Sequence, residues 1–214
     1  PEFTMLEWYR PGFDHHRLMD EVEELLQAVL GVQPGERISY ADAFRRHAAI
    51  DPHAASDGEL RSRVAALGVA GVAELDRDDL LNLLVSHVVE PRLGTGRPSF
   101  LFDYPASQAA LARIRPGDPP VAERFEVFLD GLELANGFHE LADPGEQRRR
   151  FEADLEERRR QGLPEVPVDE RLLAALAAGL PDCAGVALGV DRLVMLKIGS
   201  RDIADVIAFP IDRA

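Results

Sequence analysis

The sequence is poor in cysteine and in positive charge. Cys183 is the only cysteine among 214 residues, so no disulfide can form within the chain, and this composition is typical of a reducing cytoplasm. Lys and Arg number 24 against 38 Asp and Glu, a formal net charge of -14. Because phosphate backbones are bound by clustered Lys and Arg, the excess of acid argues against a broad nucleic-acid surface, and a tRNA partner is not favoured.

Long apolar runs are also missing. No stretch approaches the roughly 20 apolar residues that a membrane-spanning helix needs, and the first residues lack the basic-then-apolar pattern of a signal peptide. The chain is long enough to bury one substantial core. We therefore expect a single domain in the cytoplasm, with no membrane partner.

The first half of the chain predicts one strand followed by helices. Residues 1–10 alternate in polarity, so that Glu7 and Tyr9 share one face of a strand. Asp14 is placed to cap a helix that runs to about Leu30. Further helices are expected near 40–48, 57–67 and 78–89, separated by Gly, Pro and Asp. We interpret residues 31–97 as a helical insertion within the domain.

After Pro98 the pattern returns to strands. Asp130-Gly131 stands between two apolar runs and predicts a two-residue hairpin. Helices are expected at 145–161 and 169–179, and residues 185–196 read as a strand followed by a helix. Because hairpins as well as helices join the strands, the pattern favours an α+β fold, an antiparallel sheet flanked by helices.

Two segments carry most of the recognisable chemistry. In LELANGFHEL (132–141) two carboxylates, Glu133 and Glu140, bracket a small polar turn, and paired carboxylates can hold a divalent cation against polyphosphate oxygens. In GVALGVDRLVML (185–196) glycines let a flat group approach the backbone. Arg192 opens the helix that follows, where its planar fork matches phosphate. Together the segments predict a nucleotide bound beside an amine.

Three segments resemble motifs of class II aminoacyl-tRNA synthetases. PEFTMLEWYR (1–10) resembles the second half of motif 2, LELANGFHEL resembles the lysine and metal segment of lysyl-tRNA synthetases, and GVALGVDRL (185–193) resembles motif 3. YPASQAALA (104–112), RFEVFLDGLELANGFHEL (124–141) and VIAFPIDRA (206–214) extend the likeness over nearly the whole chain to the elongation factor P lysine ligases. These are stand-alone paralogues of lysyl-tRNA synthetase without an anticodon-binding domain.

The resemblance implies a two-step ligase reaction. ATP and a lysine-type amino acid, (R)-β-lysine in this family, would give an aminoacyl adenylate, and the acyl group would pass to a lysine of elongation factor P. ATP and Mg²⁺ are the implied cofactors. The resemblance assigns magnesium to Glu133 and Glu140. It assigns ATP to Glu133, Leu134, Gly189 and Arg192, and gives Arg192 a catalytic role as well. The residues that it assigns to the amino acid are Tyr9, Glu7, Asn136, Phe138, Glu140 and Ala187.

Ala187 bears on the choice of amino acid. Lysyl-tRNA synthetases usually have glycine at the matching position, whereas the elongation factor P ligases have alanine. The added methyl group would reshape the pocket near the backbone end of the substrate. We therefore expect a β-amino acid to be preferred over α-lysine.

The resemblance does not cover the start of the family's domain. Motif 1, a serine-bearing substrate segment and the first half of motif 2 would all lie upstream of Pro1. We therefore expect this chain to be weakly active or inactive as a fragment, with dimerisation through motif 1 in doubt. Two alternatives stay open: a fragment of a tRNA-charging lysyl-tRNA synthetase, and a non-catalytic module that binds an amino acid.

Overall fold

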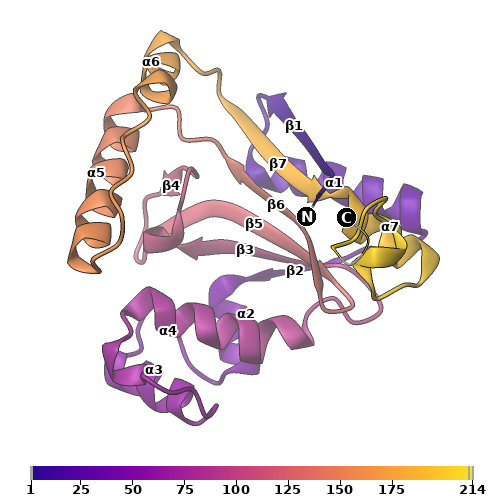
Figure 1. Ribbon diagram of the computed structural model, residues 1–214, viewed down its shortest axis with the longest axis horizontal. Helices are drawn as coiled ribbons and strands as arrows, with labels where there is room; N and C mark the ends of the chain where they lie inside the picture. Colours follow the sequence, from indigo (N-terminus) through magenta and orange to yellow (C-terminus); the bar gives the residue numbers. More distant parts are fainter. Residues whose placement is uncertain (1, 212, 214) are drawn as a thin grey trace.

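The fold is built on one seven-stranded sheet (Figure 1). The structure, a computed structural model, describes residues 2–211 and 213. The strands are β1 (Met5–Pro11), β2 (Glu36–Ser39), β3 (Ser99–Pro105), β4 (Ile114–Arg115), β5 (Val121–Leu129), β6 (Leu132–His139) and β7 (Cys183–Gly189). Their order is β1-β7-β6-β5-β3-β2, with β4 paired to β5. The predicted α+β class is confirmed.

One pair departs from the expected antiparallel sheet. β2 runs parallel to β3, whereas the other pairs in the described part of the chain are antiparallel. The chain reaches β3 from β2 through a long helical connection, and such crossovers are what parallel neighbours require. The segment 31–97, predicted to be helical, thus also supplies the edge strand β2.

Helices surround the sheet close to the predicted positions. They are α1 (His15–Leu30), α2 (Tyr40–His47), α3 (Asp57–Ala65), α4 (Arg77–Leu84), α5 (Pro144–Arg160), α6 (Glu170–Ala178) and α7 (Val190–Ile198). The Asp14 side chain accepts a hydrogen bond from the Arg17 amide and caps α1, which ends at the left-handed Gly31. α4 continues through a π-helical turn, Val85–Val89, and a 3₁₀ turn, Glu90–Arg92. None of the described helices has the length and apolar character to span a membrane.

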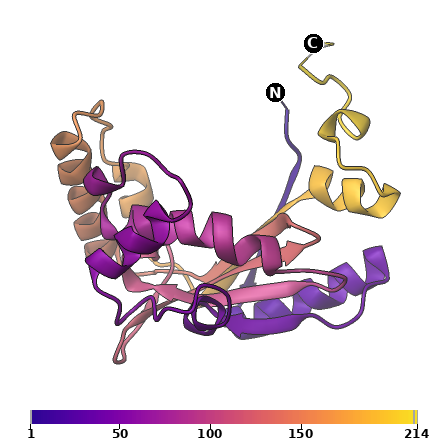
Figure 2. The ribbon, with the colours of Figure 1, turned by 90° about the horizontal axis from the view of Figure 1, so that it is seen from below.

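The two faces of the sheet differ in what covers them. α1 lies along one face, while α4, α5 and α7 rise on the other side and leave its centre open (Figure 2). The covered face packs Leu18, Val22 and Leu26 of α1 against Phe125 and Val127 of β5, all fully buried. We call the other side the open face, and it holds the candidate site.

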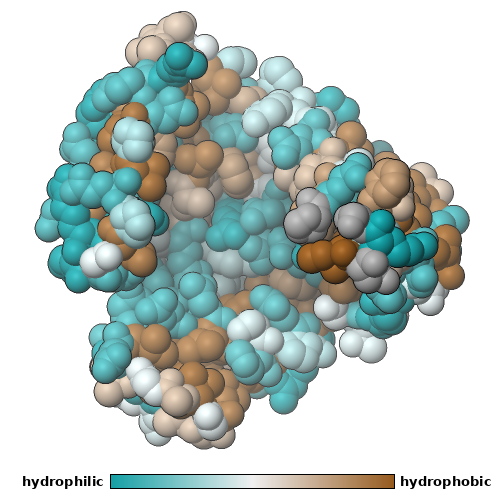
Figure 3. All heavy atoms as spheres, in the orientation of Figure 1, coloured by the Kyte–Doolittle hydropathy of each residue, from teal (hydrophilic) through white to brown (hydrophobic). Residues whose placement is uncertain are grey.

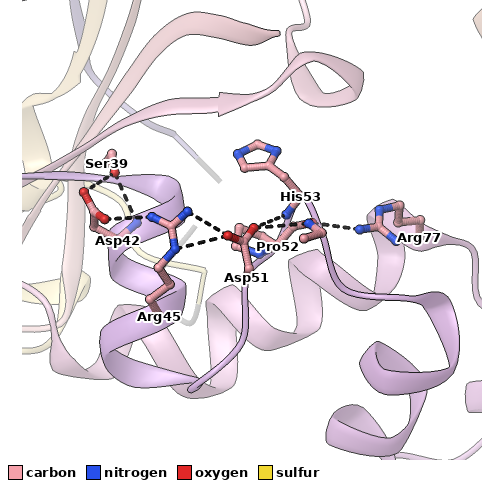
Figure 4. Close-up of polar contacts among 8 residues, drawn as sticks. Ser39, Asp42, Arg45, Asp51, Pro52, His53 and Arg77 are labelled. Atoms are coloured by element: carbon pink, nitrogen blue, oxygen red, sulfur yellow. Dashed lines mark hydrogen bonds and ion pairs between the residues drawn. The ribbon is translucent and has the colours of Figure 1, made fainter. Parts of the chain in front are cut away.

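A second core holds the helical lobe, which we define as residues 36–93. Phe44 of α2 and Leu80 of α4 are fully buried in it. Outside this core, Arg45 bridges Asp42 at 2.9 Å and Asp51 at 2.7 Å (Figure 4). The lobe thus has both a packed apolar core and ion pairs on its surface.

A hairpin and a bulge set the side-chain pattern of the open face. Asp130 and Gly131 have φ angles of 49° and 79°, the left-handed pair of a type I′ turn, so the predicted hairpin is confirmed. The pairing of β5 with β6 shifts between Val127 and Phe128. In a regular strand Glu133 and Asn136, three residues apart, would face opposite sides. The bulge brings both onto the open face.

Candidate active site

The open face aligns residues from four strands in one row. Glu7 of β1 pairs with Ala187 of β7, Ala187 with Asn136 of β6, and Asn136 with Glu126 of β5. Side chains directly opposite on neighbouring strands lie on the same face. Sequence segments far apart in the chain therefore meet in one line of acidic, amide and small side chains.

The next row completes a small polar cavity. Tyr9 pairs with Gly185, Gly185 with Phe138, and Phe138 with Arg124. The space over β1, β7 and β6 measures about 200 Å³, and we call it the carboxylate hollow. Its lining includes every residue that the sequence assigned to the amino acid: Glu7, Tyr9, Asn136, Phe138, Glu140 and Ala187.

Glu140 is the more buried of the two carboxylates in this hollow. Its side chain has no hydrogen bond or ion pair to any residue that the structure describes. Burial raises the pKa of its carboxyl from 4.5 to about 7. Burial, Glu140 and Glu7, in that order, also raise the pKa of the Tyr9 hydroxyl. A cation bound here would remove the cost of burying this negative charge.

Gly185 keeps the hollow open. A Cβ atom at this position would come within 2.7 Å of the Tyr9 ring and closer still to the Glu140 carboxylate. The Tyr9 and Glu140 side chains both lie above Gly185, so even one methyl group there would displace them. The hollow therefore needs glycine at this position.

A second cavity of about 370 Å³ adjoins the first, and we call it the arginine hollow. Asn136 and Ala187 line both cavities, which places the two side by side on the open face. Gly189 ends β7 at this point, and α7 starts at Val190. The Arg192 guanidinium donates to the Glu133 carbonyl oxygen at 2.6 Å and lies 3.7 Å from the Glu133 carboxylate.

The nucleotide residues expected from sequence all border the arginine hollow. Glu133, Leu134, Gly189 and Arg192 line it. The Leu134 side chain is 2% exposed and packs in the core beneath the sheet, which leaves its backbone to face the cavity. The cavity thus offers a helix start, a guanidinium and a glycine where an anion and a flat group could lie.

The structure does not bring Glu133 and Glu140 together. They lie toward opposite ends of β6, Glu133 in the arginine hollow and Glu140 in the carboxylate hollow. A seven-residue separation along an extended chain spans roughly 23 Å. The two carboxylates therefore line different cavities, and the assignment of magnesium to both stays a prediction.

Glu126 is the acidic neighbour of Glu133 that sequence reasoning missed. Burial first, and then the charge of Glu126, raise the pKa of the Glu133 carboxyl. Arg124 donates to Glu126 at 2.5 Å and to the Asn136 side chain at 3.3 Å. The alternation of Arg124 and Glu126 with buried apolar residues in β5 was the available signal. Among the described residues, no three His, Cys, Asp or Glu form a group that could hold a metal ion.

Comparison with known proteins gives consistent matches. A family described as tRNA synthetases class II (D, K and N) matches residues 1–213. Proteins named elongation factor P (R)-beta-lysine ligase from Salmonella paratyphi B, Salmonella heidelberg and Salmonella enteritidis PT4 are each 58% identical to the chain over 216 residues. The match covers 100% of this chain and 66% of each relative. The chain thus spans just under two thirds of the length of these curated relatives.

Proposed function

The chain belongs to the class II tRNA synthetases (D, K and N), and from this membership we propose that it activates (R)-β-lysine with ATP and transfers it to a lysine of elongation factor P. One observation carries the proposal. A cavity that ends in a carboxylate without an ion-pair partner among the described residues adjoins a cavity bounded by an arginine and a helix start, with Asn136 and Ala187 between them. The names of the relatives supply the specific amino acid and acceptor.

The carboxylate hollow would hold the amino acid through its ammonium groups. β-Lysine carries two of them, and the hollow offers the carboxylates of Glu7 and Glu140 with the hydroxyl of Tyr9. Charge-assisted hydrogen bonds to carboxylates are the strong ones for an ammonium donor. The substrate carboxylate would then point along the row toward Asn136 and Ala187, where the arginine hollow begins.

The arginine hollow would hold ATP. In the first step an oxygen of the substrate carboxylate attacks the α-phosphorus, a P–O bond to pyrophosphate breaks, and the aminoacyl adenylate remains. The Arg192 guanidinium would exchange its hydrogen bond to the Glu133 carbonyl for phosphate oxygens and stabilise the negative charge of the transition state. Catalysis then rests on alignment and charge, and no side chain needs to act as nucleophile.

Magnesium would fit between Glu133 and Glu126. Mg²⁺ usually binds proteins through one or two carboxylates, and substrate phosphates and water complete its shell. Glu126 lies close enough to raise the pKa of the Glu133 carboxyl, and two neighbouring carboxylates suit that donor set. In the free protein Glu133 lies beside Arg192, and Glu126 pairs with Arg124. The ion would neutralise charge on the phosphate oxygens.

In the second step a neutral lysine amine of the acceptor attacks the acyl carbonyl. A C–N bond forms, the bond between the acyl carbon and the phosphate oxygen breaks, AMP leaves and one proton is released. The methyl group of Ala187 borders both hollows, where the acyl group would lie. We propose that it favours the β-amino acid over α-lysine.

Labelled amino acid tests the proposal directly. The chain, ATP and Mg²⁺ are incubated with (R)-β-lysine or α-lysine, and pyrophosphate exchange is measured. Labelled amino acid is then offered with elongation factor P and with lysine tRNA in parallel. Weak exchange stimulated by the β isomer, with label on elongation factor P, is the expected result. Label on tRNA would favour a tRNA-charging enzyme, and affinity for β-lysine without exchange would favour a non-catalytic module.

A further inference from the structure

A third cavity adjoins the carboxylate hollow and has no role in the proposed reaction. It measures about 440 Å³ and lies between α6 and the paired ends of β1 and β7, where Pro11 faces Cys183. In the space-filling view, hydrophobic side chains gather on the inner side of the ridge over α5 and α6, toward the sheet (Figure 3). We call this cavity the distal pocket.

The wall of the distal pocket is mostly apolar. Among the lining residues that the structure describes, Glu140 is the only one with a carboxylate, and none has a basic side chain. Five leucines contribute to the wall: Leu111, Leu141, Leu172, Leu176 and Leu180. Because burial of a charge in such surroundings is costly, whereas burial of hydrocarbon is favourable, the pocket suits an uncharged and largely apolar group.

A buried amide on this wall independently indicates a polar atom in the ligand. Gln147 of α5 lines the distal pocket and is 2% exposed. Its backbone N–H donates to the Asp143 carbonyl oxygen at 3.0 Å, but its side-chain amide has no hydrogen bond to any residue that the structure describes. A buried amide without a partner costs free energy. Since it offers both N–H donors and an acceptor oxygen, it is the natural complement of another amide.

The three cavities of the open face follow one another. Asn136 and Ala187 line both the arginine and the carboxylate hollow, and Tyr9 and Glu140 line both the carboxylate hollow and the distal pocket. In the proposed function the terminal amine of the amino acid lies at Glu140, where the distal pocket begins. A group attached to that amine therefore extends away from ATP and into the distal pocket.

We propose that the chain also binds and activates lysine-type amino acids whose terminal amine carries a short acyl chain, with that chain in the distal pocket and its amide bonded to Gln147. This inference rests on the proposed function, which places the terminal amine at Glu140. The amide carbonyl accepts from Gln147, the amide N–H donates to Glu140, and the hydrocarbon packs against the leucines. Adenylation is the same as before, because the substrate carboxylate reacts and the amide stays intact.

A series of ligands tests the apolar wall. Calorimetry measures binding to the full chain of (R)-β-lysine acylated on its terminal amine with acetyl, propionyl or butyryl groups. Each added methylene should strengthen binding about two- to fourfold, because more hydrocarbon is buried. A succinyl group, which ends in a carboxylate, should bind at least about tenfold more weakly than butyryl. Absence of binding by the acylated forms, or affinity that falls as the chain lengthens, would overturn the proposal.

Two neighbouring alanines of α6 provide a matched pair of variants. Ala175 lines the distal pocket, whereas Ala174 does not, and both are exposed. Ala175→Leu should fill part of the pocket and weaken binding of butyryl-β-lysine about fivefold or more, and Ala174→Leu should weaken it less than about twofold. Binding of unmodified β-lysine is measured in both variants. Equal losses in the two variants, or equal losses for the two ligands, would contradict a pocket for the acyl group.

Gln147→Leu tests the hydrogen bond to the amide. Leucine has a similar size, and the glutamine amide has no partner among the described residues, so the thermal midpoint should be unchanged or raised. Butyryl-β-lysine should nevertheless bind about three- to tenfold more weakly, with a smaller change for unmodified β-lysine. A lowered midpoint with equal weakening for both ligands would show that Gln147 has a structural role only.

Pyrophosphate exchange on the same samples separates this inference from the proposed function. Exchange with β-lysine, but neither binding nor exchange with the acylated forms, would overturn the inference and leave the proposed function standing. Binding that strengthens from acetyl to butyryl, without exchange for any amino acid, would contradict the proposed activity and retain the distal pocket as a binding site.

Discussion

The open face of the sheet and the helical lobe beside it use their residues in contrasting ways. On β7 the open face carries Gly185, Ala187 and Gly189, and the neighbouring Glu140 has a raised pKa of about 7. In the lobe, Phe44 is fully buried and Arg45 is paired with two aspartates. The first region leaves space and charge for ligands, and the second fills its interior with closely packed apolar side chains. Stability and chemistry are therefore concentrated in different parts of one fold.

The largest expected effect is on the stability of the lobe. Phe44→Ala removes a fully buried ring and should lower the free energy of unfolding by about 3–5 kcal/mol. Urea denaturation followed by circular dichroism measures this change. Amino-acid affinity of the fraction that stays folded should not change. A large loss of affinity there would mean that lobe and site are coupled.

Arg192→Ala should cause the largest change at the site itself. Loss of a group that stabilises transition-state charge typically lowers rates by about 10²–10³, and we expect pyrophosphate exchange to fall by this amount. Arg201→Ala is the matched control, because Arg201 donates to the Asp130 carbonyl and does not line the arginine hollow. Equal losses in both variants would contradict the role given to Arg192.

Gly185→Ala tests whether amino-acid binding needs the empty space above Gly185. The new methyl group would clash with the Tyr9 ring and the Glu140 carboxylate. Overpacking of this kind costs about 1–3 kcal/mol, which corresponds to roughly 5- to 150-fold weaker amino-acid binding by calorimetry. At Gly189, on the same face, a Cβ would meet nothing closer than 3.6 Å. Gly189→Ala should therefore weaken amino-acid binding much less, and the reverse order would refute the geometry.

Glu140→Gln tests the buried carboxylate through pH. Because its folded pKa is about 7 and its ordinary value is 4.5, the native state holds the proton more tightly than the unfolded chain. Wild-type stability should therefore fall as pH rises from 4.5 to 7, and the variant should lack this loss. Allowing for the solvent that still reaches the group, we expect the variant to be about 1 kcal/mol more stable at pH 8 and equal at pH 4.

The same variant should change amine binding in the opposite direction. In the wild type, affinity for a diamine should increase as pH rises through 7 and Glu140 ionises. The Gln variant should bind more weakly at pH 8 and show no such increase. Calorimetric titrations at several pH values measure both properties. A wild-type affinity that does not vary between pH 6 and 8 would contradict an ammonium site at Glu140.

Ala187→Gly should produce the smallest effect. Removing one methyl group from the border of the two hollows is worth about 1 kcal/mol or less in discrimination. We expect the ratio of β-lysine to α-lysine in pyrophosphate exchange to fall a few-fold. An unchanged ratio would show that Ala187 does not select the isomer.

The residues of the candidate site were assigned by the family resemblance, and local patterns predicted the strand and the turn near them. The shared face of Glu7 and Tyr9 and the Asp130-Gly131 turn needed only such patterns. The division of Glu133 and Glu140 between two cavities did not follow, because it depends on which distant segments surround each end of β6. Three features could not be predicted because they depend on pairing between distant segments. They are the bulge in the β5–β6 pairing, the parallel strand β2 and the nearness of Glu126 to Glu133.

A crystal structure with a non-hydrolysable β-lysyl adenylate analogue, such as the sulfamoyl adenosine, would show whether one ligand spans both hollows, with its amine end at Glu140 and its nucleotide end at Arg192. We expect ammonium groups hydrogen-bonded to Glu140 and Glu7, the acyl group beside Ala187, and adenosine against Gly189. An analogue bound in the reverse direction, or bound outside these hollows, would contradict this expectation.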